Sequence, residues 1–430
     1  MSVCHSILES NASKPAIRPI KTVQVPRRLA EHSWGGTETT ILETSRSLEA
    51  SGHPTSIFTT KSLCDHPHEN FGRIPVRRFD YSYPFLGLSA TDKDDMDQKG
   101  GNLLSFSLMK ALLLEPNIDL LHAHSGKRLG GTVRTVARIR RIPYVISLHG
   151  GVFDVPMKEQ ESLLEPIQGK FEWGKPFGMM LGSRRVLQDA SAIVCVGQAE
   201  YEAARRLLPG QRVEHLKNGV DCARFRHGDG VRFRYRYALR KNAKIILCIS
   251  RIDPQKGQLT LVDAMPEIIK SDPNAHLVLI GPVTRPVYMK RIQERIRALG
   301  LQNRVLVLPG IRPGDSTLID AYHAADVFCL PSMHEPFGIV ILEAWAAGCP
   351  VVATRVGGIP GFVRDGQDAL LVKPDCAREL GGALVHLLKR PGLRARFGDS
   401  GRRRAMAEFD WSVVTTKLIS LYRDLCGVAD

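Results

Sequence analysis

Short runs of apolar residues alternate along the chain with longer segments in which apolar positions recur every three or four residues. The short runs predict strands and the longer segments predict helices, an alternation typical of parallel α/β sheets. The strands expected in the first half are Thr22–Val25, Ser56–Thr59, Val76–Phe79, Leu120–His122, Tyr144–Leu148, Ala192–Val196 and Val213–Leu216. Those expected in the second half are Ile245–Ile249, His276–Ile280, Val305–Leu308, Val327–Leu330, Pro350–Ala353 and Ala369–Val372. The pattern therefore predicts two Rossmann-like, doubly wound parallel sheets, one in each half.

The segment Lys217–Asp221 predicts the junction between the two halves. It contains Asn218-Gly219, a turn signal, and a basic, irregular segment follows it. We therefore expect a first domain over residues 20–220 and a second over 221–410, with an amphipathic helix at Trp411–Leu425 inside a last segment, 411–430. Residues 1–19 are polar and lack the apolar core of a signal peptide, so they predict a disordered lead-in.

Composition narrows the class of protein. The chain has 430 residues, 43% of them hydrophobic and 24% charged, which is ordinary for a globular protein. No apolar run reaches the roughly 20 residues that a membrane-spanning helix needs. The nine cysteines form no Cys-x-x-Cys pair and predict buried, reduced thiols in a cytoplasmic protein.

The net charge of +15 is concentrated in two basic runs, over residues 127–141 and 389–404. Such runs are either solvated helix faces or surfaces that attract an anionic membrane or substrate. They lack interleaved aromatic residues and no nucleic-acid-binding fingerprint accompanies them, so we expect no nucleic-acid partner.

Two cations follow the first strand expected in the second half. Arg251 and Lys256 lie beyond the carboxyl end of Ile245–Ile249, and Lys256-Gly257 opens the next predicted helix. Ligands of open parallel sheets bind at the carboxyl ends of the strands, and free N–H groups at a helix start attract anions. These residues predict a phosphate site, although a surface arginine and lysine in a loop are common in any protein.

A second group of candidates follows the strand Val327–Leu330. Glu335 lies in the turn, Phe337-Gly338-Ile339 begins the next helix, and Glu343 lies eight residues after Glu335. Gly338 lets a phosphate approach the backbone, and carboxylates suit sugar hydroxyls. The alternative is that Glu335 is only a charge at the start of the helix and Glu343 only a solvent-facing helix residue. The apolar residues around Glu343 argue against the alternative for that residue. Together with the two cations, the group predicts a nucleotide-sugar site.

The first half offers weaker candidates. Gly35-Gly36 lies in the first loop and permits close approach of a phosphate or an acceptor, although loops use glycine pairs freely. His149 ends the strand Tyr144–Leu148, where it can hydrogen-bond a sugar hydroxyl or serve a structural role.

Several other motifs fail as sites. Ser125-Gly126-Lys127 lacks the residues of a phosphate-binding Walker loop, and His122 with His124 has no third metal ligand nearby. Asp92–Asp95 lies in what we expect to be a solvated polar loop. The sequence therefore predicts no metal site.

The chain resembles the retaining glycosyltransferases of family 4, which have the two-domain GT-B fold. The pair Glu335 and Glu343 matches that family's Glu-x7-Glu element, and the supporting motifs occur in the family's order between about Gly35 and Trp411. They are Gly35-Gly36 with Gly52-His53, His122-Ala123-His124, Leu148-His149-Gly150, Asn218–Asp221, Arg251 with Lys256-Gly257, and Gly357–Pro360.

The resemblance implies roles for the matching residues. Arg251 and Lys256 would neutralise the diphosphate with help from the backbone of Gly36, Gly338 and Ile339, and Glu343 would hold the ribose. Glu335 and His149 would contact the transferred sugar. The implied catalytic set is Glu335, His149, Arg251 and Lys256, and the implied donor-binding set is Gly35, Gly36, Arg251, Lys256, Gly281, Gly310, Glu335, Phe337, Gly338, Ile339 and Glu343. Backbone groups near Gly281 and Gly310 would read the base, no cofactor or divalent metal would be needed, and the last helix would pack back on the first domain.

We therefore expect a cytoplasmic enzyme that moves a hexose-type sugar with retention from a nucleoside-diphosphate sugar. UDP-sugars are favoured as donors and GDP-mannose comes next. The expected acceptor is a glycan or a lipid-linked glycan, met at the inner face of an anionic membrane through the basic segment Arg134–Arg141. The alternative is a catalytically silent nucleotide-sugar binder or regulator of the same fold.

Overall fold

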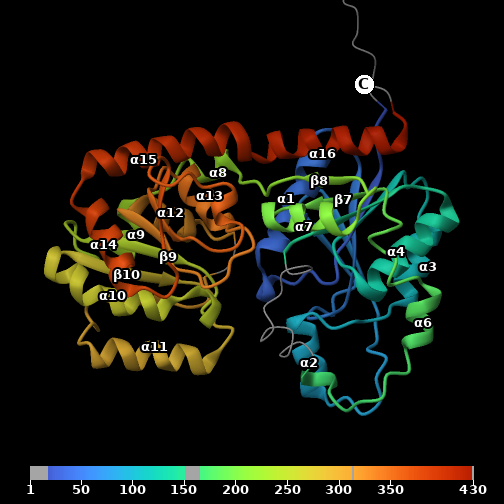
Figure 1. Ribbon diagram of the computed structural model, residues 1–430, viewed down its shortest axis with the longest axis horizontal. Helices are drawn as coiled ribbons and strands as arrows, with labels where there is room; N and C mark the ends of the chain where they lie inside the picture. The colour runs from blue at the N-terminus through green and yellow to red at the C-terminus, as the bar shows by residue number, and fades with distance from the viewer. Residues whose placement is uncertain (1–17, 151–164, 312–313, 429–430) are drawn as a thin grey trace, which may run out of the picture.

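The computed structural model describes residues 18–150, 165–311 and 314–428, and it contains two α/β domains connected end to end (Figure 1). Each domain has one sheet with helices on both of its faces. The predicted fold class, two doubly wound sheets, is confirmed.

The first sheet has eight strands in the order β3-β4-β2-β1-β5-β6-β7-β8. They are β1 (Thr22–Val25), β2 (Thr55–Thr60), β3 (His68–Phe71), β4 (Ile74–Phe79), β5 (Leu120–Ala123), β6 (Tyr144–Leu148), β7 (Ala192–Cys195) and β8 (Val213–His215). All neighbours pair in parallel except β3 and β4, which pair antiparallel. The chain winds outward from the central pair β1 and β5 in both directions.

The second sheet has six parallel strands in the order β11-β10-β9-β12-β13-β14. They are β9 (Lys244–Ile249), β10 (Ala275–Ile280), β11 (Val305–Leu308), β12 (Val327–Leu330), β13 (Val351–Thr354) and β14 (Ala369–Val372). Apart from the edge strand β11, whose residues are mostly half-buried, their side chains are nearly all buried on both faces, as expected for strands covered by helices on both sides.

Helices cover both sheets (Figure 1). Those of the first domain are α1 (Gly36–Ala50), α2 (Ala90–Lys99), α3 (Phe106–Leu114), α4 (Lys127–Arg140), α6 (Lys175–Met180) and α7 (Gln198–Leu207). Those that follow are α8 (Cys222–Phe225), α9 (Gly230–Arg236), α10 (Gln258–Ser271), α11 (Pro286–Ala298), α12 (Ser316–Ala324), α13 (Ile339–Ala346), α14 (Ala377–Leu388), α15 (Pro391–Arg404) and α16 (Trp411–Cys426).

The last helix, α16, returns to the first domain, where it lies along one side of the sheet (Figure 1, red). Leu418, Leu421 and Tyr422 are buried there in a cluster with Ile20 and Val145. The apolar face of α16 thus lies against the first sheet, while the preceding π-turn at Ala405–Phe409 packs on the second domain.

The sequence pattern predicted every strand except β3. The strand β3 has the sequence His-Glu-Asn-Phe, with partly and fully exposed positions alternating, so it carries no apolar run. The expectation of a loop at Asp92–Asp95 was wrong, since these residues lie in α2. The Ser89 hydroxyl accepts from the amide N–H of Asp92, and the Asp92 carboxylate accepts from the amide N–H of Ser89, which caps this polar helix.

The basic run 127–141 forms α4 and its end, and most of its guanidinium groups are used inside the protein. Arg128 pairs with Glu172, Arg134 pairs with Asp189, and Arg140 donates to carbonyl oxygens at the end of α3. The expected basic face for an anionic membrane is therefore largely absent from α4. Within the described ranges, no helix has the length and apolarity to cross a bilayer. The lead-in expected at residues 1–19 falls almost wholly outside those ranges.

Candidate active site

Several of the candidate residues follow the strands at which each sheet reverses its winding. In the first sheet these strands are β1 and β5, and in the second they are β9 and β12. Gly35 follows β1, Arg251 and Lys256 follow β9, and Glu335 follows β12. Ligands of doubly wound sheets bind at such switch points, so both domains present their binding edges through these loops.

The loops after β9 and β12 pack on each other and bring Lys256 to Glu335. Gly257 has a φ of +66°, and a Cβ at this position would lie 2.1 Å from the Pro331 carbonyl oxygen, so only glycine permits this approach. The amide of Met333 donates to the Gln255 carbonyl at 2.7 Å. As a result, Lys256 Nζ lies 2.6 Å from Oε2 of Glu335, 79 residues away in sequence.

Glu335 is held from both sides. Ser332 Oγ donates to its Oε2 at 3.3 Å, and its carbonyl accepts from the amide of Gly358 at 2.9 Å. Gly357 has a φ of +52°, and a Cβ there would lie 2.1 Å from the Glu335 carbonyl oxygen. The glycine pair after β13 therefore allows the chain to pass directly beneath the glutamate, a role that the sequence alone did not assign to it.

Arg251 differs from Lys256 because it is exposed, and its guanidinium has no acidic partner among the described residues. The backbone beside it is fixed, since Gln258 donates to the Arg251 carbonyl at 2.8 Å and to Ser250 Oγ at 2.9 Å. The domain thus presents one cation already paired with a carboxylate and one cation available to an incoming anion.

The start of α13 lies next to the Lys256–Glu335 pair, since a Cβ at Gly338 would lie 3.4 Å from Glu335 Cγ. Gly338 has a φ of +95° and ends the turn, and Ile339 opens the helix, whose start has no side-chain cap, so its first N–H groups can bind an anion. The ring of Phe337 points the other way, into the core, where it stacks on Phe362 with the ring centres 4.6 Å apart. Only the backbone of Phe337 is therefore placed to contact a ligand.

Glu343 lies on the second turn of α13, half-buried, and Tyr322 donates its hydroxyl hydrogen to Oε2 at 2.8 Å. Burial raises the pKa of Glu343, and the hydrogen bond from Tyr322 opposes that shift. One carboxylate oxygen is thus held by the protein. Tyr322 is a functional candidate that sequence inspection missed, because it is a single tyrosine in α12 and its partner Glu343 lies 21 residues away in the next helix.

The two domains meet at these same loops. A Cβ at Gly36, the first residue of α1, would lie 3.3 Å from Ile339 Cδ1, and one at Gly150 would lie 2.3 Å from Pro336 Cβ. A Cβ at Gly197, after β7, would lie 3.2 Å from the Pro336 carbonyl oxygen. The starts of α1 and α13 therefore face each other across the domain interface, which brings Gly36, Gly338 and Ile339 together as the donor-site hypothesis requires.

His149 follows β6 at this interface, beside Gly150. Its Nε2 lies 2.9 Å from Nδ1 of His124, and its Nδ1 is buried with no hydrogen-bond partner in the described part of the chain. Burial lowers the pKa of His149 to about 4, so the imidazole is neutral at pH 7. The structure thus places an unpartnered ring nitrogen where the two domains meet.

The remaining glycines of the predicted set take different positions. Gly35 precedes α1, and its amide donates to the Glu38 carboxylate at 3.0 Å. Gly281 follows β10 with a φ of +145°, and a Cβ there would lie 2.0 Å from the Ser250 carbonyl. Gly310 follows β11 with a φ of +84° and open space where a side chain would project. Both therefore lie at the same carboxyl edge as Arg251.

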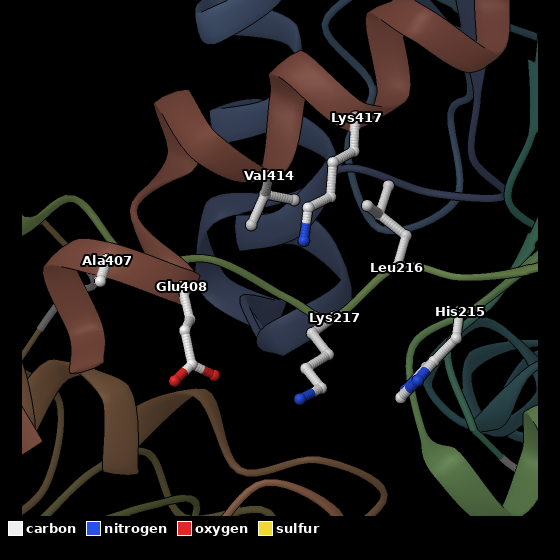
Figure 2. Close-up of a pocket in the computed structure, with 7 residues that line it drawn as sticks. All are labelled: His215, Leu216, Lys217, Ala407, Glu408, Val414 and Lys417. Atoms are coloured by element: carbon white, nitrogen blue, oxygen red, sulfur yellow. The ribbon is translucent and has the colours of Figure 1, made fainter.

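A separate pocket of about 160 Å³ lies at the junction of the domains (Figure 2). Its lining residues are His215, Leu216, Lys217, Ala407, Glu408, Val414 and Lys417. Glu408 is paired with Arg404 through both oxygens. No predicted donor residue lines this pocket, so the cations and helix starts at the domain interface define the candidate active site.

Among the residues that the structure describes, no group of three or more histidine, cysteine, aspartate or glutamate side chains is arranged to hold a metal ion. His122 and His124, considered above as ligands, instead stack on each other with ring centres 4.4 Å apart.

Comparison with known proteins identifies the family of each domain. The family described as Glycosyltransferase Family 4 matches residues 34–224, and the one described as Glycosyl transferases group 1 matches residues 232–404. The chain is 31% identical to D-inositol 3-phosphate glycosyltransferase 2 of Catenulispora acidiphila over 409 residues, 90% of each chain. It is also 31% identical to D-inositol 3-phosphate glycosyltransferase of Nocardia farcinica, covering 90% of this chain and 84% of the relative.

Solved structures show the same fold. Sucrose-phosphate synthase from Thermosynechococcus elongatus superimposes with a TM-score of 0.71 at 22% identity, over 95% of this chain and all of that one. Anabaena Alr3699/HepE in complex with UDP-glucose gives a TM-score of 0.69 at 20% identity, over 94% of this chain and all of that one. With both domains matched and full-length relatives above 30% identity, the chain is a GT-B glycosyltransferase and belongs to glycosyltransferase family 4.

Proposed function

We propose that the protein transfers a hexose from a nucleoside-diphosphate sugar, with retention of anomeric configuration, to a hydroxyl group of an acceptor. A UDP-sugar is the favoured donor and GDP-mannose the second choice. The observation that carries the proposal is the meeting of Lys256, paired with Glu335, and two helix starts at the domain interface, with the exposed Arg251 in the loop that leads to Lys256. This is an arrangement for a diphosphate.

In this proposal the diphosphate leaves with its negative charge stabilised by Arg251, Lys256 and the N–H groups at the start of α13. These groups supply the stabilisation without a divalent metal. Glu335 holds the sugar, Glu343 holds the ribose, and His149 accepts a hydrogen bond from a sugar hydroxyl. The solved neighbour that contains UDP-glucose supports the choice of a UDP-sugar.

We propose that the acceptor binds in the first domain, near the ends of β5 and β6. We propose a glycan or lipid-linked glycan, and a phosphorylated polyol is the second candidate because the relatives named above are D-inositol 3-phosphate glycosyltransferases. Lys127 at the start of α4 is an exposed cation near the end of β5, where it can pair with such a phosphate.

We place the reaction in the cytoplasm, with contact to an anionic membrane face as an added proposal. Because α4 uses most of its arginines internally, the membrane contact has to rely on other cations, including the exposed Lys389 and Arg403. Binding to anionic liposomes at low salt, lost when these two are changed to glutamine, supports this contact, and an absence of binding at low salt rules it out.

The alternative is a nucleotide-sugar binder without transfer activity. The intact set of Glu335, Glu343, Arg251 and Lys256 argues against it. The deciding experiment incubates the protein with UDP-glucose or GDP-mannose and either inositol 3-phosphate or a glycan acceptor. Release of nucleoside diphosphate that depends on the acceptor, with a product of the donor's anomeric configuration by NMR, supports the proposal. Tight donor binding without any product supports the binder.

A further inference from the structure

His149 belongs to a chain of buried polar side chains that runs through the first sheet to the last helix. Its Nε2 contacts Nδ1 of His124 at 2.9 Å, and Nε2 of His124 contacts Oε1 of Gln24 at 2.8 Å. Gln24 Nε2 donates to the hydroxyl oxygen of Tyr422 at 3.5 Å. This series of hydrogen bonds therefore connects the domain interface with α16 through Gln24, a fully buried residue of β1.

The series of hydrogen bonds continues from Tyr422 to two further side chains. The Tyr422 hydroxyl lies 2.5 Å from Nδ1 of His122, and Nε2 of His122 lies 2.7 Å from Ser147 Oγ. Burial lowers the pKa of His122 to about 3 and that of His124 well below its usual range. All three histidines are thus neutral at pH 7, so each carries one ring hydrogen and one acceptor nitrogen.

Because the histidines are neutral, the hydrogen bonds from Gln24 to His149 have a fixed order of donors and acceptors. Gln24 presents its oxygen to His124, so His124 Nε2 carries the hydrogen and its Nδ1 is an acceptor. His149 Nε2 must then carry the hydrogen that this acceptor receives. The second nitrogen of His149, Nδ1, is left as an acceptor, and it is the buried atom that has no partner within the described residues.

If the oxygen and nitrogen of the Gln24 amide exchanged positions, donor and acceptor would be swapped in every hydrogen bond between Gln24 and His149. His149 Nδ1 would then carry the hydrogen and act as a donor. The contacts on the other side can be satisfied with either orientation of the amide, and the structure has the one that makes His149 Nδ1 an acceptor. Gln24 Nε2 donates to Tyr422, which in turn donates to His122, and His122 donates to Ser147, so each group has a partner. The orientation of one amide therefore decides what His149 offers to a ligand.

We propose that Gln24 is a positioning residue for His149: through His124 it holds His149 as the Nε2–H tautomer, so that Nδ1 accepts a hydrogen bond from a hydroxyl of the bound sugar. This inference rests on the proposed function for its ligand, but the tautomer itself can be measured without any substrate. Gln24 touches no reacting atom, and its effect reaches the sugar only through the two histidines.

The first experiment records long-range proton–nitrogen correlations of the full chain labelled with ¹⁵N-histidine at pH 7.5, with His149 assigned by its loss in His149→Asn. We expect the Nε2–H pattern in the wild type and a mixture of both tautomers in Gln24→Met, which keeps the side-chain size. The matched control is Thr22→Val. Thr22 lies in β1 with Gln24, and its buried hydrogen bond to Thr55 of β2 is not part of the hydrogen-bond chain described above. It leaves the His149 signal unchanged.

Gln24→Glu provides the rescue. Its carboxylate has acceptor oxygens only, so it keeps the contact to His124 and restores the Nε2–H pattern of His149. An Nδ1–H pattern or a charged imidazole in the wild type overturns the proposal, and so does an unchanged tautomer in Gln24→Met.

The second experiment measures transfer. Gln24→Met is expected to lower kcat/KM for the donor about tenfold, the size of one hydrogen bond, while Gln24→Glu recovers most of the loss and Thr22→Val shows none. Equal losses in Gln24→Met and Thr22→Val reduce Gln24 to a packing role and overturn the proposal. If no acceptor gives transfer, the proposed function fails while the tautomer measurement still decides the role of Gln24.

Discussion

Lys256 Nζ lies 2.6 Å from Oε2 of Glu335, and both side chains are nearly buried, with 13% and 10% of their surfaces exposed. A buried ion pair is sensitive to the loss of one partner, because the other charge is left without compensation. In this protein the pair lies beneath the proposed diphosphate site. Lys256 therefore has a structural role in addition to any role in binding.

The first prediction concerns this pair. Lys256→Ala is expected to lower the free energy of unfolding by about 3–5 kcal/mol, because it leaves the Glu335 carboxylate buried and unpaired. Adding Glu335→Gln is expected to recover most of that loss, since no charge remains. Urea unfolding of the wild type, the single variant and the double variant measures both effects. A double variant as unstable as Lys256→Ala would contradict the coupling.

The second prediction concerns the contact between the domains. Gly150→Ala places a methyl group where Pro336 Cβ lies 2.3 Å away, so the domains cannot approach as closely. We expect a loss of at least tenfold in kcat/KM. Gly72→Ala is the matched control, because Gly72 also has a positive φ, +68°, but nothing within 4 Å of the added carbon. Equal effects in both variants would show that backbone strain, and not domain contact, is responsible.

The third prediction tests the anchoring of Glu343. Tyr322→Phe removes the hydroxyl that holds Oε2, which raises the pKa of Glu343 further and frees its carboxylate to move. Donor affinity is expected to fall about three- to tenfold. Tyr144→Phe serves as the control, since it deletes a similar buried hydrogen bond to the Val186 carbonyl in the other domain. Comparable losses of donor affinity in the two variants would count against a role for Glu343.

The fourth prediction concerns pH. The folded-state pKa of His149 is lowered to about 4, below its usual value of 6.5, so the unfolded chain binds a proton first as the pH falls. The contribution to stability is complete above pH 6.5 and is lost between about pH 6.5 and 4. Unfolding measured at pH 7.5 and at pH 5 is expected to show a smaller decline in His149→Asn than in the wild type. Identical declines would mean that His149 is not held neutral.

Sequence patterns predicted much of this fold because buried parallel strands carry continuous apolar runs. The strands Tyr144–Leu148 and Val327–Leu330 were located to the residue. The edge strand His68–Phe71 was missed because its exposure leaves no apolar run, and the helix at Ala90–Lys99 was missed because its capping groups, not apolar periodicity, stabilise it.

The candidate site was partly predictable for a related reason. Parallel strands end at one edge of a sheet, so Arg251, Lys256 and Glu335 could be grouped from their positions after strands. Gln24 and Tyr322 could not be found this way. Their roles depend on partners that are distant in sequence, His124 and Glu343, and only the folded arrangement brings these together.

The central claim is that the domain interface binds a nucleoside diphosphate, and Arg251 offers the cleanest test because it is exposed and its guanidinium has no acidic partner among the described residues. Calorimetric titration with UDP, GDP and ADP should be run on the wild type, on Arg251→Ala and on the control Arg297→Ala, which changes an exposed residue of α11. We predict that one diphosphate binds the wild type and the control equally. Arg251→Ala is predicted to weaken that binding ten- to a hundredfold without changing the melting temperature of the free protein. Failure of all three diphosphates to bind, or equal affinity in Arg251→Ala, would contradict the account.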